Sequence, residues 1–212
     1  SVARNSANAL VLRYGDTDYV TIKDFFTSTA GYYQIEQFKF SDGVTWKASD
    51  LINQAIYYGS SGNDSMSAYS GSVNQARGGD GLDTIYGASY ADTLSGGAGN
   101  DSIIGNDGSD SLSGDADNDT IYAGAGLDTL VGGTGLDYLE GNTGNDTYIF
   151  SSGDGSDYLY DYDSASGNSD TVSFTNVKST DVKSVARNSA NALVLRYGDT
   201  DYVTIKDFFT ST

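Results

Sequence analysis

Residues 78–149 read GGDGLDTIYGASYADTLSGGAGNDSIIGNDGSDSLSGDADNDTIYAGAGLDTLVGGTGLDYLEGNTGNDTYI. Cut into blocks of nine, this stretch gives eight copies of the pattern G-G-x-G-x-D-x-U-x, in which U is a large apolar residue. An unbroken short period with one apolar position is typical of a parallel β-solenoid, because a single repeat is too small to bury a core without its neighbours. We therefore expect an all-β fold built around such a solenoid.

The sixth position of every repeat is an aspartate, and its setting indicates a metal site. Glycines at positions one, two and four let the backbone enter left-handed conformations, so that carbonyl oxygens turn toward a common point. Carboxylate and carbonyl oxygens together suit a hard cation. The chain has no His and no Cys, which removes the usual zinc, copper and iron ligands and leaves calcium as the expected ion. The expected carboxylate ligands in the array are Asp83, Asp92, Asp101, Asp110, Asp119, Asp128, Asp137 and Asp146.

Each of these aspartates is followed by a predicted three-residue strand whose middle residue is apolar. Because strand side chains alternate between faces, the middle residue should point inward and its neighbours outward. The expected inward residues are Ile85, Leu94, Ile103, Leu112, Ile121, Leu130, Leu139 and Tyr148, and the expected outward residues include Thr84, Thr93, Ser102, Ser111, Thr120 and Thr129. Two repeats would make one coil, with ions between successive turns. Alternate repeats would then stack, giving one row of Asp83, Asp101, Asp119 and Asp137 and a second of Asp92, Asp110, Asp128 and Asp146.

Weaker copies of the repeat flank the array at 59–67, 68–76, 152–160 and 167–173. The first copy keeps Asp64 as a candidate ligand and Met66 as an inward residue, whereas the second has lost both the aspartate and the apolar residue. On the exit side, Asp157 and Leu159 occupy the same two roles. Asp170, in the last copy, is either a ligand or a plain turn aspartate.

The array should fold only with its metal. Eight inward apolar side chains form a small core for 72 residues. Successive coils would lie about 4.8 Å apart, so neighbouring carboxylates in a row repel by roughly 1 kcal/mol even in water. When no preformed site exists, the free energy of metal binding becomes free energy of folding. We therefore expect the array to be disordered without calcium and to fold when it binds several calcium ions, about six to eight.

Composition supports this interpretation and excludes other partners. Of 29 acidic residues only Glu36 and Glu140 are glutamates, a selectivity that an acidic disordered tail, the main alternative, would not require. The net charge of −18 argues against nucleic acid, and no apolar run is long enough for a membrane span. No N-terminal signal peptide is visible. Because extracellular modules typically need about 0.1 to 1 mM calcium, we expect a secreted, extracellular or cell-surface protein.

A second repeat lies outside the array: residues 1–29 recur without a change at 184–212. One explanation is a tandem array whose unit is 183 residues, of which this chain is a window slightly longer than one unit. The other is a duplication made by engineering. The first explanation predicts neighbouring copies of the same block as partners, and an exposed sheet edge in the second copy would favour self-association through the duplicated hairpin.

The duplicated segment and its continuation are predicted to be β-rich. ALVLRY and YVTIKDFF are joined by GDTD, which predicts a hairpin, and YYQIEQFKF, SDG and VTW follow in the first copy. A short helix is expected from Asp50, capped by Ser49, to about Ile56. The expected domains are a capping module at 1–58, the calcium-binding solenoid at 59–160 and a β-rich flank at 161–212.

The nonapeptides resemble those of RTX (repeats-in-toxin) proteins, and YYQIEQFKFSDGVTWKASDLI and DTYIFSSGDGSDYLYDYD resemble the haemolysin-type calcium-binding-related module and the exit segment of such proteins. The resemblance implies a right-handed parallel β-roll, export by type I secretion machinery, and calcium held by sixth-position aspartates and by carbonyls of positions one to four. Carried over, the carbonyl ligands would include Gly79, Gly81, Gly96, Gly97, Ala98, Gly99, Gly132, Gly133, Thr134 and Gly135. Three departures weaken individual sites: Tyr90 and Asp117 replace the fourth-position glycine and Ala123 replaces the first.

The sequence favours a scaffold or extender block of a large secreted toxin or adhesin. An enzyme is disfavoured, because a chain without His or Cys has no Ser-His-Asp triad, Cys nucleophile or zinc-protease helix; a carboxylate-pair glycosidase stays formally open. The alternative function is a surface that binds a glycan, ice or another protein through the outward Thr and Ser residues and the 17 tyrosines.

Overall fold

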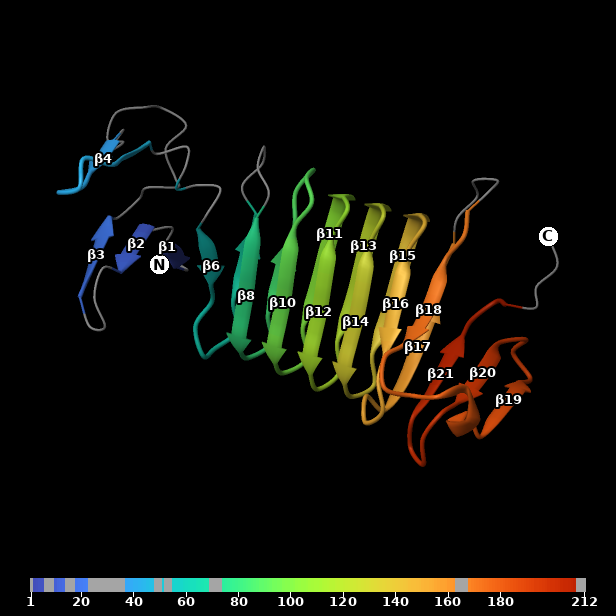
Figure 1. Cartoon of the computed structure of the whole chain (residues 1–212). Coiled ribbons are helices and arrows are strands. Elements are labelled where there is room, and N and C mark those ends of the chain that lie inside the picture. Colours follow the sequence, from blue (N-terminus) through green and yellow to red (C-terminus); the bar gives the residue numbers. More distant parts are fainter. Residues whose placement is uncertain are drawn as a thin grey trace.

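The computed structural model describes residues 2–5, 10–13, 18–22, 37–47, 51, 55–68, 74–162 and 168–208. These residues form β-strands and one 3₁₀ turn, η1 (Ser179–Asp181), which confirms the all-β fold. The molecule is a long stack of strands with a small antiparallel sheet at each end (Figure 1). No helix in the described part of the chain is long and apolar enough to cross a membrane.

The stack consists of two parallel sheets that the chain visits alternately. The first sheet contains β6 (Ile56–Tyr58), β8 (Gln75–Asp80), β10 (Thr93–Ala98), β12 (Ser111–Ala116), β14 (Thr129–Thr134), β16 (Thr147–Phe150) and β18 (Thr171–Phe174). The second contains β7 (Ser65–Ser67), β9 (Thr84–Tyr86), β11 (Ser102–Gly108), β13 (Thr120–Gly126), β15 (Tyr138–Gly144) and β17 (Ser156–Tyr160). Two repeats therefore make one coil, as predicted.

The apolar position of each repeat forms the core of the solenoid. All eight predicted inward residues are at most 1% exposed, and Met66 and Leu159 join the same cluster. Each apolar residue pairs in register with the one two repeats later, as Leu94 does with Leu112. The predicted outward Thr and Ser residues are half-buried or exposed. One expectation was wrong: most strands in the array are six or seven residues long, because parallel pairing continues through the first positions of the next repeat.

The degenerate repeat at the entry lies one residue later than the sequence predicts. Asn74 donates its backbone N–H to Asp92 Oδ1 at 2.7 Å, so it occupies the position of the missing aspartate. Ala76 pairs in register with Leu94 and is 4% exposed. The coil is therefore kept by a smaller apolar residue, whereas the sequence suggested that the apolar position had been lost.

The N-terminal copy of the duplicated segment forms a three-stranded antiparallel sheet, or meander: β1 (Val2–Asn5), β2 (Leu10–Arg13) and β3 (Tyr19–Ile22). Its first strand pairs in parallel with β6 and so extends the first sheet. The predicted hairpin that follows is β4 (Gln37–Lys39) and β5 (Thr45–Lys47). Most of the expected helix lies outside the described residues, and of its described residues only Leu51 has a helical backbone. Its predicted end at about Ile56 is wrong, because Ile56 begins a strand.

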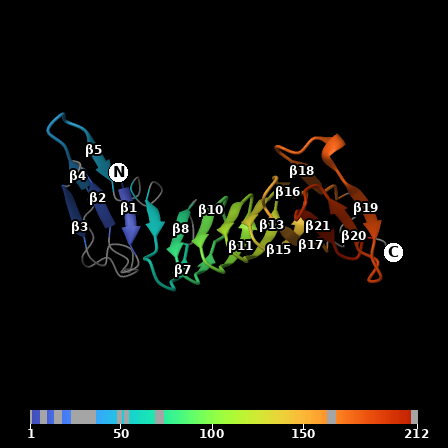
Figure 2. The same ribbon diagram turned by 90° about the horizontal axis from the view of Figure 1, so that it is seen from below.

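The C-terminal copy forms the same meander from β19 (Ser184–Arg187), β20 (Leu193–Arg196) and β21 (Tyr202–Ile205). Here the last strand, β21, pairs in parallel with β17 and extends the second sheet. The two meanders therefore lie at opposite ends of the stack, which Figure 2 shows from below. The predicted hairpins of both copies are confirmed.

Candidate metal centre

The repeat aspartates form two rows along the stack, as predicted, and a backbone hydrogen bond links each member to the next. In both rows the N–H of one residue donates to Oδ1 of the aspartate in the next coil, at 2.7–3.1 Å. The first row is Asp64, Asp83, Asp101, Asp119, Asp137 and Asp157. The second row is Asn74, Asp92, Asp110, Asp128, Asp146 and Asp170.

The second carboxylate oxygen of each aspartate, Oδ2, takes no part in these hydrogen bonds. It is buried and has no hydrogen-bond partner in Asp83, Asp101, Asp110, Asp119, Asp128, Asp137 and Asp157. These residues are at most 3% exposed. A buried carboxylate oxygen without a donor is strongly disfavoured, because it has lost water and gained nothing in return. Repeated along both rows, it indicates that a cation belongs beside these oxygens.

The first glycine of each repeat leaves the space that these oxygens face. A Cβ added to Gly114 would lie 2.2 Å from Asp119 Oδ2 and 2.5 Å from the carbonyl oxygen of Gly132 in the next coil. Gly78 shows the same convergence of Asp83 Oδ2 and the Gly96 carbonyl. Carboxylate and carbonyl oxygens from two coils thus gather in one place. This all-oxygen donor set suits calcium.

The second and fourth positions of most repeats have a left-handed backbone. Gly97 has φ +116°, and Asn106, at the same position of the next repeat, has φ +74°. Asparagine and aspartate tolerate this conformation better than other side chains. Asp117 likewise has φ +73° at the fourth position, so its replacement of glycine keeps the turn.

One turn departs from this geometry. Neither Ala88 nor Tyr90, which stand at the second and fourth positions, has positive φ. The N–H of Ala88 instead donates to Asp92 Oδ2 at 2.8 Å. The entry turn behaves similarly, because Asp64 Oδ2 accepts hydrogen bonds from the N–H and the hydroxyl of Ser60. Asp64 and Asp92 are therefore satisfied by the protein itself, although the sequence placed them with the other ligands.

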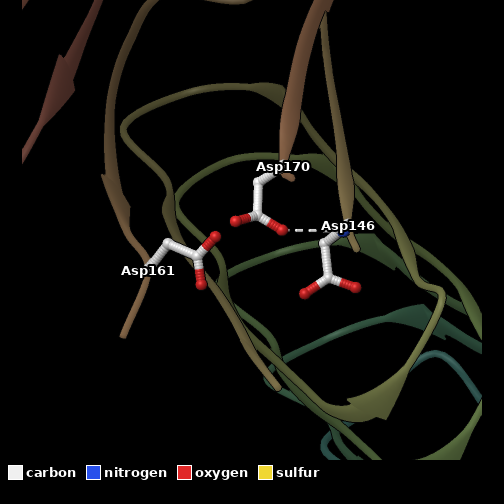
Figure 3. Close-up of side chains that lie close together, drawn as sticks. All are labelled: Asp146, Asp161 and Asp170. Atoms are coloured by element: carbon white, nitrogen blue, oxygen red, sulfur yellow. Dashed lines mark hydrogen bonds between the residues drawn. The ribbon is translucent and has the colours of Figure 1, made fainter. Parts of the chain in front are cut away.

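A further carboxylate joins the second row at its C-terminal end. Asp161 faces Asp146 and Asp170 (Figure 3), and the three residues offer oxygens that all lie within 4.8 Å of one another. Burial, and then the nearby Asp170 carboxylate, raise the pKa of Asp161 to about 7. Asp161 was not predicted as a ligand, because it stands outside the nonapeptide register and carries no motif. Asp170 was predicted to be either a ligand or a plain turn aspartate, and its Oδ1 accepts the N–H of Asp146 at 2.9 Å, which places it in the row.

The carbonyl ligands implied by the RTX resemblance differ in what their oxygens face. Gly96 and Gly132 present their carbonyl oxygens toward the first-position glycine of the preceding coil. The carbonyl of Ala98 accepts a hydrogen bond from the Gly81 N–H at 2.7 Å. The remaining residues of that set lie in the same stacked turns, where they are Gly79, Gly97, Gly99, Gly133, Thr134 and Gly135.

The buried rows are electrostatically unfavourable without a cation. Burial raises the pKa of Asp119 to about 8, and the neighbouring charges of Asp137 and Asp101 add to the shift. Burial likewise raises the pKa of Asp110 to about 7 and of Asp157 to about 8. The pKa values of Asp101 and Asp137 rise to about 6 for the same main reason. A metal ion would reverse this cost, because it favours the charged carboxylate.

These shifts predict that acid favours the roll when calcium is absent. Each carboxylate with a raised folded-state pKa destabilises the roll above that value, and the penalty is lost as pH falls toward the unfolded value of about 4. In calcium-free buffer, lowering the pH from 8 to 5 should therefore increase the β-signal in circular dichroism. In the presence of calcium, lowering the pH should have the opposite effect on folding. Protons then compete with calcium for the carboxylates, so the calcium midpoint should rise. An unchanged β-signal from pH 8 to 5 in calcium-free buffer would contradict the prediction.

Two family models match the chain. Residues 10–50 match the haemolysin-type calcium binding protein related domain. The RTX calcium-binding nonapeptide repeat (4 copies) matches in overlapping segments at 77–112, 86–121, 104–139, 113–148 and 122–159. These matches cover the first hairpins and the aspartate rows from Asp83 to Asp157.

Among solved structures, the chain is similar to the extracellular lipase LipA from Serratia marcescens, with 19% sequence identity and a TM-score of 0.33. The similarity covers 72% of this chain and 37% of the lipase chain, so the chain spans well under half of that lipase's length. No curated protein matches the sequence.

Proposed function

Because the chain carries RTX calcium-binding nonapeptide repeats next to a haemolysin-type calcium-binding-related domain, we propose that it is a calcium-folded structural block of a large protein that is secreted by a type I system. The observation that carries the proposal is the repeated buried Oδ2 without a donor. Outside the cell, calcium neutralises the two rows and the chain folds into a rigid roll. The block then acts as a scaffold or extender, with no catalytic role.

We propose further that each ion lies between two successive turns. It is held by the Oδ2 of a sixth-position aspartate and by carbonyls such as those of Gly96 and Gly132, which converge beside first-position glycines. About six to eight ions fill both rows. At the end of the second row, Asp161 completes the ligand set with Asp146 and Asp170. The calcium-binding repeats lie mainly at 59–160, and the hairpin modules at 1–58 and 161–212, which also contribute β6, β18, Asp161 and Asp170 to the stack, act as its caps.

A stack of coils suits a spacer, since every coil contacts only its neighbours and length is set by the number of repeats. Export in the unfolded state fits a chain in which neighbouring carboxylates of each row repel one another when calcium is scarce, as in the cytosol. Both points support the secretion and scaffold roles, which rest on the family resemblance and on the charge of the rows.

The proposal predicts unequal effects for two aspartates of the same row. Asp110→Asn removes a charge whose Oδ2 has no hydrogen-bond partner, whereas Asp92→Asn removes one whose Oδ2 already accepts from Ala88. Equilibrium dialysis with radioactive calcium should show the loss of one or two ions from Asp110→Asn. The Asp92→Asn variant serves as the matched control and should keep nearly the full number. Equal losses would contradict the ligand assignment, and binding of no calcium by the unaltered chain would contradict the function.

A further inference from the structure

The two identical 29-residue segments dock onto the roll through opposite edges. The N-terminal meander uses its first strand, β1, which pairs in parallel with β6 at the start of the roll. The C-terminal meander uses its third strand, β21, which pairs in parallel with β17 at the end. One sequence thus contains two edges that recognise two different ends of a roll, and each copy within the chain uses only one of them.

Each copy has one outer strand that does not pair with the roll and forms the edge of its sheet. This edge strand is β3 in the first copy and β19 in the second. Val20, in β3, is 45% exposed, whereas its counterpart Val203 is fully buried against the end of the roll. All four residues of β19 are exposed, and Val185 there is 64% exposed. The strand edge that one copy leaves unpaired is therefore the edge through which the other copy pairs with the roll.

The centre of the meander shows the same complementarity. In the first copy Leu10 is fully buried against Leu51, in a cluster that includes Phe38 and Trp46. Its counterpart Leu193 is only half-buried, while Leu195 and Ile205 of the same meander pack against the core of the roll. Leu193 is thus less covered than Leu10, although the two residues occupy the same position in identical segments.

Strand direction and register allow both dockings in one copy. A three-stranded meander has parallel outer strands, so it can continue a parallel sheet on each side. From the end of the roll, the pairing register runs from Leu159 to Ile205, Leu193 and Arg187. The counterpart of Arg187 is Arg4, which pairs with Tyr57 at the start of the roll. The two registers would therefore align Leu159 of one roll with Tyr57 of the next, and both residues belong to the core of the roll.

We propose that the 29-residue meander is a two-sided joint that links successive 183-residue units into one continuous β-structure. In the joint, the YVTI strand closes the second sheet of the preceding roll, and the SVAR strand opens the first sheet of the following roll. The occupant of the β19 edge is thus the β6 strand of the next copy of the unit. The Leu51 region of that copy covers Leu193 in the same way as it covers Leu10.

The test is a two-unit chain, in which residues 1–212 are followed directly by a second copy of residues 30–212. The matched pair combines Ala186→Cys in the first unit with Ile56→Cys in the second unit. In the joint these two positions would pair in the same way as Ala3 pairs with Ile56 within one unit. The chain has no native cysteine, so the disulfide yield within one molecule reports this contact alone. The positive control combines Ala3→Cys with Ile56→Cys in the first unit. The out-of-register control combines Ala186→Cys with Ser60→Cys in the second unit.

In saturating calcium, the joint predicts that the matched pair cross-links within threefold of the positive-control rate and at least tenfold faster than the out-of-register pair. A matched pair that reacts no faster than the out-of-register pair, in chains with full β-signal in circular dichroism, would overturn the joint. Circular dichroism keeps the two proposals apart. A missing calcium-dependent β-signal would count against the proposed function, whereas a missing cross-link in folded chains would count against the joint only.

Discussion

Removal of calcium from the full chain is expected to abolish most of its β-structure. Seven buried Oδ2 oxygens have no donor, and burial raises the pKa of the central aspartates. At neutral pH the metal-free roll must therefore either bury unneutralised charge or take up protons, and both carry a free-energy cost that the unfolded chain avoids. The inward column adds only one large side chain per repeat, which is too little to offset that cost.

Circular dichroism during a calcium titration, with scattering on the same samples, measures both the β-content and the compaction. The β-signal and the compaction should appear together, and the transition should be cooperative because each aspartate row is shared between successive turns. Magnesium is the matched control: it demands a smaller, octahedral site and dehydrates reluctantly, so it should not substitute at equal concentration. Full β-content of the 59–160 region in excess chelator would refute the metal requirement.

Asp119→Asn is expected to have the largest effect of any single substitution in the rows. Asp119 lies mid-row, and its Oδ1 accepts the N–H of Asp101 at 2.7 Å. Asparagine keeps an acceptor oxygen for that hydrogen bond and removes only the charge. The calcium midpoint for folding should rise at least about tenfold, equivalent to about 1.4 kcal/mol. Without calcium the sign should reverse, because a buried charge whose pKa is raised to about 8 has been removed.

The matched control is Asp80→Asn, which removes the same charge from an exposed side chain in β8. It should leave the calcium midpoint within twofold of the unaltered chain. Equal shifts in both variants would show that net charge, and not a ligand role, controls folding. A purely structural role for Asp119 would lower stability in both conditions, which a titration with and without calcium distinguishes.

Much of the roll could be predicted because its information is local and periodic. The inward residues follow from alternation along a strand, and the two aspartate rows follow from two repeats per coil. Both predictions agree with the structure, down to the pairing of Leu94 with Leu112. Where periodicity weakens, prediction was less accurate. The degenerate repeat was placed one residue early, because Asn74 and Ala76 are recognisable only through their partners in the next coil.

The differences among aspartates depended on contacts between particular side chains and backbone groups. Asp92 matches the motif as well as Asp110 does, yet the changed turn at Ala88 supplies its Oδ2 with a donor. Asp161 has no motif and reaches the second row only because the exit segment folds back beside Asp146 and Asp170. No pattern of spacing encodes either arrangement.

The sequence by itself determined the repeat, the oxygen-rich ligands, the inward column and the identity of the two 29-residue segments, because each of these is a property of residue type and period. Only the tertiary structure decided which edge of each segment is buried. Identical strands have identical propensities, so the choice between β1 and β21 as the docking edge depends on which end of the roll lies beside the segment. That neighbour is a long-range contact, and it gives one sequence two different roles in the same chain.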